Sequence, residues 1–542
     1  MRLFRALFPL VVAVGAGSAV CQARPSLEKV LHRWIQSYEK NDLQLAELAV
    51  VRGKVDPIYG KGWITGVLLD ATHRVGLAVL LDRATKKPTV PLAQEIIRLT
   101  AMGLLDGKAT LYRPHYAVRH LGKIALSRCT TTDCMFFLMQ VADGDMSAFR
   151  KRPKDAAGFR AAAIFALGSM GKPVVRPTLQ KQLRAEDRIV RLATAEALEQ
   201  MRHPRTLDDL AAAMRVETDP IVAQALVRSV KSVLALHGKE VDKRQLQAVV
   251  QSAVRLSGRT DWRADLEIVE LFVNLRSAGS IPALISILEN ATGSSHRLRE
   301  AAGDALKSLT GAILPVSEPA KWREYWKGVQ DTFVVAPAKK LGATRTAAGF
   351  FGLPVRGSNV VFIIDTSGSM QTAFFAAGDY EPDELEPDQT RLRVAKLELL
   401  KAVKGMSADS KFNLVSFATE VKPWRKKLVL ATKNTRSGLV QAIQKMRPVG
   451  ATNIFGALET ALGIKTLQYG ARYETPVDEV FLLSDGEPTA GKVVDTVTIL
   501  QLIEETNRYS KVRINTIYMG GGGGSVFMEL LATQNGGRYV RL

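Results

Sequence analysis

The chain has 542 residues, which is enough for two or three domains. Hydrophobic residues make up 46% and charged residues 23% of the sequence, a balance that is typical of a folded globular protein and excludes a largely disordered one. The formal net charge is +21, of which about +18 lies before residue 350 and about +3 after it. This excess predicts either a solvated basic helical surface or contact with an anionic envelope polymer, lipid headgroups, an acidic partner or nucleic acid.

The first 23 residues have the pattern of a secretory signal peptide. Arg2 and Arg5 precede a short apolar run, residues 6–16, which is followed by small residues. The run is too short to span a bilayer comfortably, and no later segment of the sequence is long and apolar enough to do so. We therefore expect export to a periplasmic or extracellular location. A lipoprotein anchored at Cys21 is the weaker alternative, because a valine precedes this cysteine where lipid-modified proteins normally have a small residue.

Two cysteines, Cys129 and Cys134, follow the signal segment. Their spacing would close a small disulfide loop in an oxidising compartment, and two free thiols are the alternative. A zinc site would need two more ligands, and none are spaced for it.

Two stretches, residues 160–183 and 191–214, match each other at a constant offset of 31 residues. Each has small and apolar residues at helical spacing, a break with Gly or Pro, and a second apolar helix. One such helical hairpin cannot bury its own apolar face, whereas stacked neighbours can, and the result is a solenoid with an extended concave surface. The six matching pairs are Arg160 and Arg191, Ala162 and Ala193, Ala166 and Ala197, Leu167 and Leu198, Pro173 and Pro204, and Leu179 and Leu210.

This pattern resembles HEAT repeats in their short form, and it predicts an all-α solenoid. We assign HEAT-like repeats to residues 151–312 and divergent helical repeats to residues 24–150. Residues 313–350 are expected to hold a short helix and a linker. Trp322 and Trp326 lie four residues apart, on the face of that helix that we expect to pack on the last repeat.

After residue 350 the sequence alternates between strand and helix patterns. Near-continuous apolar runs over residues 360–364 and 479–485 are typical of strands that are buried on both faces. The alternation predicts a doubly wound, Rossmann-like α/β domain over residues 351–542, with a mostly parallel sheet. Ligands bind such sheets at the carboxyl ends of the strands. Further strands are expected over residues 411–418, 512–519 and 538–540, and helices over residues 391–403, 435–446, 454–467 and 495–509.

Five oxygen-bearing side chains are expected at that edge of the sheet. A D-x-S-x-S motif follows the first buried run, a threonine begins a later helix, and an aspartate ends the second buried run. Carboxylate and hydroxyl oxygens suit hard divalent cations, so the set predicts a site for Mg2+, with Mn2+ or Ca2+ as alternatives. No histidine or cysteine follows His296, which argues against zinc or copper in this domain. The five residues are Asp365, Ser367, Ser369, Thr452 and Asp485.

With these residues, the sequence from about residue 355 to residue 542 strongly resembles the von Willebrand factor A domain family. The metal-ion-dependent adhesion site of that family uses a D-x-S-x-S motif, a later Thr and a later Asp, and all five positions match here. The resemblance implies that Asp485 acts through water and that the direct ligands of the metal supply too little negative charge to satisfy a dication. A carboxylate from a protein or glycan partner would then fill the open position.

Hydrolytic activity is disfavoured, because the domain has no histidine for a Ser-His-Asp arrangement and "SGSM" is not a G-x-S-x-G elbow. Two features depart from the simplest family members. An insertion at residues 376–388 carries six acidic residues, which would hold a second cation such as Ca2+, guard the site or form a solvated loop. A run of five glycines, residues 520–524, lacks the ending of a phosphate-binding loop, so we expect a flexible connector.

Together these features predict an exported, non-enzymatic binding protein with a metal-dependent A-type domain on a helical scaffold. A regulatory or assembly subunit of an ATPase-linked complex is an alternative, although such ATPases are cytoplasmic and the signal segment disfavours it. A polyanion-binding solenoid is a second alternative. Nucleic acid as its ligand would give binding with a steep salt dependence, and export argues against it.

Overall fold

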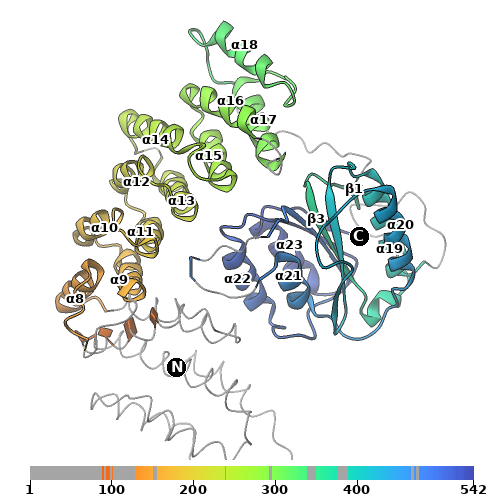
Figure 1. Cartoon of the computed structure of the whole chain (residues 1–542). Coiled ribbons are helices and arrows are strands. Elements are labelled where there is room, and N and C mark those ends of the chain that lie inside the picture. Colours follow the sequence, from red (N-terminus) through yellow and green to blue (C-terminus); the bar gives the residue numbers. More distant parts are fainter. Residues whose placement is uncertain are drawn as a thin grey trace, which may run out of the picture.

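The computed structural model of the chain describes isolated positions between residues 88 and 101 and the ranges 129–149, 156–238, 240–291, 296–337, 349–375, 389–464, 469–470 and 475–542. The predicted signal segment, most of the predicted divergent repeats and the acidic insertion at 376–388 lie outside these residues. An array of paired helices is followed by an α/β domain, and the two lie side by side (Figure 1). Within the described ranges, no helix has the length and apolar character needed to cross a membrane.

The array consists of α-helices joined by short turns, two of which are 3-10 turns, η2 (Pro173–Val175) and η3 (Ala278–Ser280). Aspartates define several of the helix starts, because an N-cap carboxylate accepts the backbone N–H groups that have no partner within the helix. Asp187, Asp219, Asp242 and Asp261 do so for α11, α13, α14 and α15. The helices are α8 (Thr132–Asp143), α9 (Ala156–Met170), α10 (Arg176–Gln182), α11 (Arg188–Met201), α12 (Thr206–Met214), α13 (Pro220–His237), α14 (Lys243–Leu256), α15 (Trp262–Leu275), α16 (Ile281–Asn290), α17 (His296–Thr310) and α18 (Pro319–Val329).

The helices form two layers. The odd-numbered helices α9 to α17 stack on one another in chain order and face the α/β domain, and the even-numbered helices lie on the other side (Figure 1). Small residues allow the close approach of neighbouring helices in the inner layer. A Cβ added to Gly168 of α9 would lie 2.5 Å from Ala197 of α11, so a larger residue would push the two helices apart. The stacked hairpins confirm the helical character that the 31-residue offset predicts.

Both cysteines after the predicted signal segment are buried thiols that do not form a disulfide with each other. Burial, together with the neighbouring Cys134, raises the pKa of the Cys129 thiol to about 12. At neutral pH this thiol is therefore protonated and a weak nucleophile. Trp322 of α18 is fully buried in the core of the array, as expected for a helix that packs on the last repeat.

The sheet of the α/β domain has the strand order β5-β4-β3-β7-β8-β9, with β6 also paired to β4. The strands β3, β4, β7, β8 and β9 run parallel, and the edge strands β5 and β6 are antiparallel to β4. The expected mostly parallel sheet is confirmed. Its strands are β3 (Asn359–Asp365), β4 (Lys411–Phe417), β5 (Val421–Pro423), β6 (Val429–Leu430), β7 (Glu479–Ser484), β8 (Arg513–Tyr518) and β9 (Tyr539–Arg541).

Helices cover both faces of this sheet (Figure 1). Alternate residues of the central strand β3 point into two separate cores, Val361 and Ile363 into one and Phe362 and Ile364 into the other. The first core lies under α21 (Ile454–Leu462), α22 (Thr496–Asn507) and α23 (Gly524–Gln534), and the second under α19 (Arg391–Gly405) and α20 (Lys433–Gln444). Burial on both faces explains why these strands read as continuous apolar runs.

Three details of the α/β domain differ from the sequence-based expectations. The helix expected over residues 454–467 ends at Leu462, because Gly463 takes the left-handed conformation with φ 64° and caps it. A small hairpin, β1 (Gly349–Phe350) and β2 (Leu353–Pro354), stands where the expected linker ends. The strands β5 and β6 were not expected, since two or three residues are too few to show an alternating pattern.

The α/β domain docks on the inner layer of the array through the segments that lead into β7 and β8. Glu196 of α11 lies at the centre of this contact and is 5% exposed. Its carboxylate accepts hydrogen bonds from the hydroxyls of Tyr469 at 2.8 Å and Tyr509 at 2.6 Å, and from the Arg508 guanidinium at 2.9 Å. The ring of Tyr469 also packs edge-on against Phe165 of α9, with 5.4 Å between the ring centroids.

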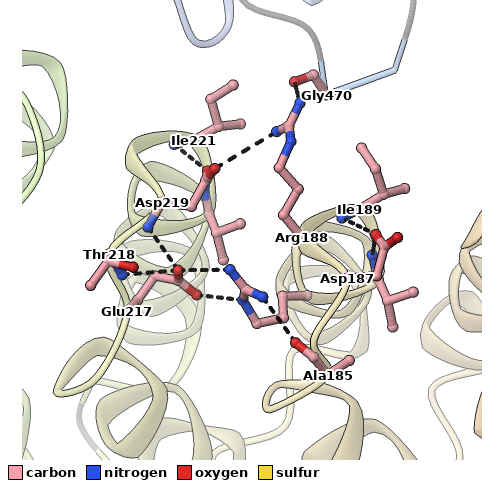
Figure 2. Close-up of polar contacts among 12 residues, drawn as sticks. Ala185, Asp187, Arg188, Ile189, Glu217, Thr218, Asp219, Ile221 and Gly470 are labelled. Carbon is pink, nitrogen blue, oxygen red and sulfur yellow. Dashed lines mark hydrogen bonds and ion pairs between the residues drawn. The ribbon is translucent and has the colours of Figure 1, made fainter.

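Further contacts extend the docking along the inner layer. Arg188 donates to the carbonyl of Gly470 at 3.0 Å and lies 3.9 Å from Asp219 (Figure 2). Nearer the end of the array, Lys511 pairs with the buried carboxylate of Glu267 on α15, which also pairs with Lys231. Burial alone would raise the pKa of Glu267, but the two ammonium groups outweigh it and lower the pKa, so Glu267 is charged at neutral pH.

This docking has two consequences. The docked segments lie at the amino ends of β7 and β8, so the carboxyl ends lie at the opposite edge, roughly 20 Å away for strands of six residues. The inner layer is already occupied by the chain's own domain. A partner surface on the array would therefore have to lie mainly on the even-numbered helices.

Candidate metal site

The site is built where the direction of strand addition reverses. The chain adds β4 on one side of β3 and β7 on the other, so a crevice opens between the carboxyl ends of β3 and β7. Asp365 is the last residue of β3, and Asp485 directly follows β7. The turn after Asp365 is also anchored to β4, because the amide of Thr366 donates to the carbonyl of Phe417, the last residue of β4, at 2.7 Å.

Asp365 is fully buried, and its carboxylate contacts neutral groups. One oxygen accepts the amide of Ser367 at 2.7 Å, and the other accepts the hydroxyl of Ser484 at 2.5 Å. Burial raises the pKa of Asp365 to about 6, and these hydrogen bonds lower it only in part. A carboxylate in such surroundings is electrostatically unsatisfied, which is the state that a bound cation would relieve.

A chain of hydrogen bonds joins the two serines of the motif to Asp485. The hydroxyls of Ser367 and Ser369 lie 3.1 Å apart, and the hydroxyl of Ser369 donates to one carboxylate oxygen of Asp485 at 2.8 Å. The 3-10 turn η5 (Gly368–Gln371) produces this arrangement, because it returns Ser369 toward β7. Four of the five predicted residues therefore lie together at one edge of the sheet.

Thr452 lies in a loop that is tied to the same edge. The carbonyl of Gly450 accepts the amide of Gly368 at 3.0 Å, and the carbonyl of Thr452 accepts the amide of Thr489 at 2.9 Å. The loop thus bridges the motif turn and the segment after Asp485. The hydroxyl of Thr452 makes no hydrogen bond to the other four residues in the described part of the chain, and its role as a ligand stays a prediction.

Two residues at this edge were not expected from the sequence. Ser484 binds Asp365, and it was overlooked because it looked like the last residue of an apolar strand. Arg391, the first residue of α19, donates to the second carboxylate oxygen of Asp485 at 2.7 Å. No pattern in the sequence links Arg391 to Asp485, since 94 residues separate them.

The donor set fits a hard divalent cation. Two carboxylates and three hydroxyls offer only oxygen, which suits Mg2+, Mn2+ or Ca2+ and disfavours softer metals. Asp365, Ser367 and Ser369 are the residues that would hold such an ion directly, with Thr452 and Asp485 as the further predicted donors. The described ranges contain no cluster of three or more His, Cys, Asp or Glu side chains that could hold a metal ion, and the candidate site itself has two such residues, Asp365 and Asp485.

The glycine run between β8 and α23 borders this site. It connects the two elements, and its fifth residue already begins the helix. Close packing requires at least one of the glycines. A Cβ added to Gly520 would lie 2.1 Å from the carbonyl oxygen of Asp485, whereas one added to Gly521 would meet nothing within 4 Å.

Replacing Gly520 with alanine is therefore expected to destabilise the domain and to shift the loop that carries Asp485. The expected loss in the free energy of unfolding is about 1–3 kcal/mol, as for other overpacked positions. Urea unfolding measures it, and Gly521→Ala is the matched control, with an expected change below about 0.5 kcal/mol. Equal effects of the two substitutions would contradict the packing described here.

Comparison with known proteins finds two families. A model of HEAT repeats matches residues 150–231, and a model of the von Willebrand factor type A domain matches residues 388–541. The expected repeats and the expected A-type domain are both found. The second match contains Thr452 and Asp485 but begins after the D-x-S-x-S motif, so the integrity of the adhesion site is a separate question.

The chain is also similar to inter-alpha-trypsin inhibitor heavy chains. Heavy chain 4 of Mus musculus is 28% identical over 214 residues, which cover 37% of this chain and 20% of that protein. Heavy chain H4 of Homo sapiens is 29% identical over 195 residues, covering 35% and 19%. The chain thus spans about a fifth of the length of these relatives. A solved von Willebrand factor type A structure from Catenulispora acidiphila matches at 16% identity with a TM-score of 0.26, covering 34% of this chain and 38% of that one.

Proposed function

We propose that the chain is an exported, non-enzymatic binding protein whose A-type domain captures an acidic group through a divalent cation. The partner is a protein or glycan that offers a carboxylate. The observation that carries this proposal is the hydrogen-bonded chain of Ser367, Ser369 and Asp485 beside the buried carboxylate of Asp365. These four residues lie at the carboxyl edge of the sheet, away from the docked array.

The residues of the site have separate tasks in this account. Asp365 supplies the negative charge that holds the cation, and Ser367 and Ser369 supply neutral oxygens. A cation bound there would offer an open coordination position to a carboxylate oxygen of the partner. Because hydroxyls carry no charge, the proposed direct ligands Asp365, Ser367 and Ser369 supply one negative charge between them, which does not neutralise a dication, and an anionic partner is favoured over a neutral one.

Recognition rather than catalysis is the favoured outcome of binding. A hydrolytic site needs a general base or an activated nucleophile beside the metal. The sequence after His296 has no histidine or cysteine for that task, and the serine hydroxyls of the site are hydrogen-bonded to each other and to Asp485. The relation to inter-alpha-trypsin inhibitor heavy chains is confined to about a third of this chain and supports a shared domain only.

The helical array acts as a rigid support in this proposal. It holds the amino-terminal edge of the sheet through Glu196 and Glu267, and it leaves the metal-binding edge directed elsewhere. The signal segment would deliver the assembly to the periplasm or the outside of the cell, where Mg2+ and acidic polymers are both available.

Partner capture is expected to depend on a divalent cation and on a carboxylate. The full chain serves as bait in a pull-down with Mg2+, with EDTA, and with Mg2+ restored after EDTA. We expect partners that are lost with EDTA, that return with Mg2+, and that millimolar glutarate releases while glutaramide, the matching neutral diamide, does not. Capture that persists in EDTA, or that both competitors release equally, would sink the proposal.

A further inference from the structure

A cationic side chain stands in the candidate metal site itself. The Arg391 guanidinium donates to the second carboxylate oxygen of Asp485, Oδ2, at 2.7 Å. The pair is shielded from solvent, with side-chain exposures of 19% for Arg391 and 0% for Asp485. Ser369 occupies the other oxygen of the same carboxylate. Both oxygens of Asp485 therefore have partners before any metal arrives.

The backbone of Arg391 is anchored beside the motif turn, and its side chain is held by the ion pair with Asp485. Its amide donates to the carbonyl of Thr372, directly after η5, and the bridge between Ala373 and Thr390 joins the same two segments. Thr390 caps α19 with its hydroxyl. The start of α19 is thereby attached to the motif turn, which places the backbone of Arg391 beside the site and within reach of Asp485.

The net charge of the site determines how strongly it attracts a cation and, once a cation is bound, an anion. The two carboxylates carry −2, and Arg391 is the cationic side chain that contacts either of them in the described ranges, so the site carries −1 before metal binds. With a dication the total becomes +1. Without Arg391 the corresponding values would be −2 and 0. Arg391 therefore repels the incoming cation and leaves the loaded site with a net positive charge.

We propose that Arg391 is a specificity-determining residue that weakens divalent-cation binding and makes the loaded site selective for an anionic ligand. This inference rests on the proposed function, because it assumes that the metal and the acidic group share this edge. The competing explanation is that Arg391 only holds Asp485 in place. The two explanations predict opposite signs for the effect of removing its charge on Mg2+ affinity.

The test is a calorimetric titration of the full chain with Mg2+ alone. Removing the charge in Arg391→Gln is expected to tighten Mg2+ binding by about tenfold, the effect of losing one partly screened positive charge close to the ion. Arg391→Lys retains the charge and is expected to stay within about threefold of the wild type. Lys404→Gln removes the same charge from the exposed far end of α19, about 20 Å away, and should change Mg2+ affinity less than twofold.

A second titration adds glutarate to the Mg2+-loaded protein. Arg391→Gln is expected to bind glutarate at least about threefold more weakly than the wild type, since the loaded site then has no net positive charge. Urea unfolding with and without a fixed concentration of Mg2+ reports the same tightening even if Arg391→Gln is less stable: Mg2+ should raise its free energy of unfolding more than that of the wild type, and an equal or smaller rise counts against the proposal.

The outcomes distinguish the role of Arg391 from the existence of the metal site. A wild type that binds Mg2+ while Arg391→Gln binds it no more tightly, or binds glutarate equally well, would overturn the role of Arg391 and leave the metal site intact. Absence of Mg2+ binding in both proteins would overturn the metal site and the inference with it.

Discussion

Replacing Asp365 with alanine is expected to abolish Mg2+ binding. Asp365 is the one carboxylate of the site that is fully buried and paired only with neutral donors, so it supplies most of the charge that would hold the ion. Loss of outer-shell partners alone costs metal sites about 10- to 100-fold in affinity, and we expect at least about 100-fold for this direct ligand. Calorimetry with the wild type and the variant measures the difference.

Two further variants keep this result interpretable. Asp365→Asn retains the shape and an oxygen acceptor for the amide of Ser367, and it should fold normally while losing Mg2+. Asp409→Ala removes an exposed carboxylate at the amino end of β4, at the far edge of the sheet, and should bind Mg2+ as the wild type does. Retention of wild-type affinity in Asp365→Ala would show that the ion binds elsewhere.

Replacing Glu196 with alanine is expected to loosen the α/β domain from the array. The substitution leaves Arg508 and the hydroxyls of Tyr469 and Tyr509 without their shared acceptor. Burial raises the pKa of both tyrosines well above the ordinary value, so each remains a protonated donor and cannot adapt. Removing one partner of a buried charged network costs about 3–5 kcal/mol, which we expect to appear in the free energy of undocking.

Hydrogen exchange of residues 508–512 measures this loss directly. A cost of about 3–5 kcal/mol corresponds to exchange that is faster by roughly two to four orders of magnitude. Glu196→Gln retains part of the hydrogen bonding and should be intermediate. Glu324→Ala removes an exposed carboxylate from α18 and should leave the exchange unchanged. Protection of residues 508–512 in Glu196→Ala equal to that in the wild type would mean that Glu196 does not hold the domain.

Local patterns were sufficient for most of the helices and the central strands, and for much of the candidate site. The apolar run before Asp365 predicts a strand buried on both faces, and the parallel topology then places Asp365 and Asp485 at the same edge. Repeated small residues at Ala162 and Ala193 predict stacked helices in the same way. These predictions depend on patterns that can be read along the sequence itself: a continuous apolar run, the alternation of strand and helix patterns, and a repeat at an offset of 31 residues.

Features that depend on distant contacts were not predictable in this way. Arg391 meets Asp485 only because β3, η5 and α19 return the chain to the edge beside β7. Glu196 appears in the sequence as one polar residue in an amphipathic helix, and its role follows from residues that lie 273 to 313 positions later. Such pairings are set by tertiary packing, for which a single sequence holds no periodic signal.

The central claim is that a divalent cation binds at the carboxyl edge of the sheet, and one diffraction experiment tests it most directly. Crystals of the full chain are soaked in MnCl2, and data are collected at the manganese absorption edge. The account predicts an anomalous peak within about 2.3 Å of oxygens of Asp365, Ser367 and Ser369, with Thr452 and Asp485 around it. A manganese peak found only at another place would contradict the claim. So would the absence of a peak at this edge in crystals whose solvent channels reach the D-x-S-x-S motif.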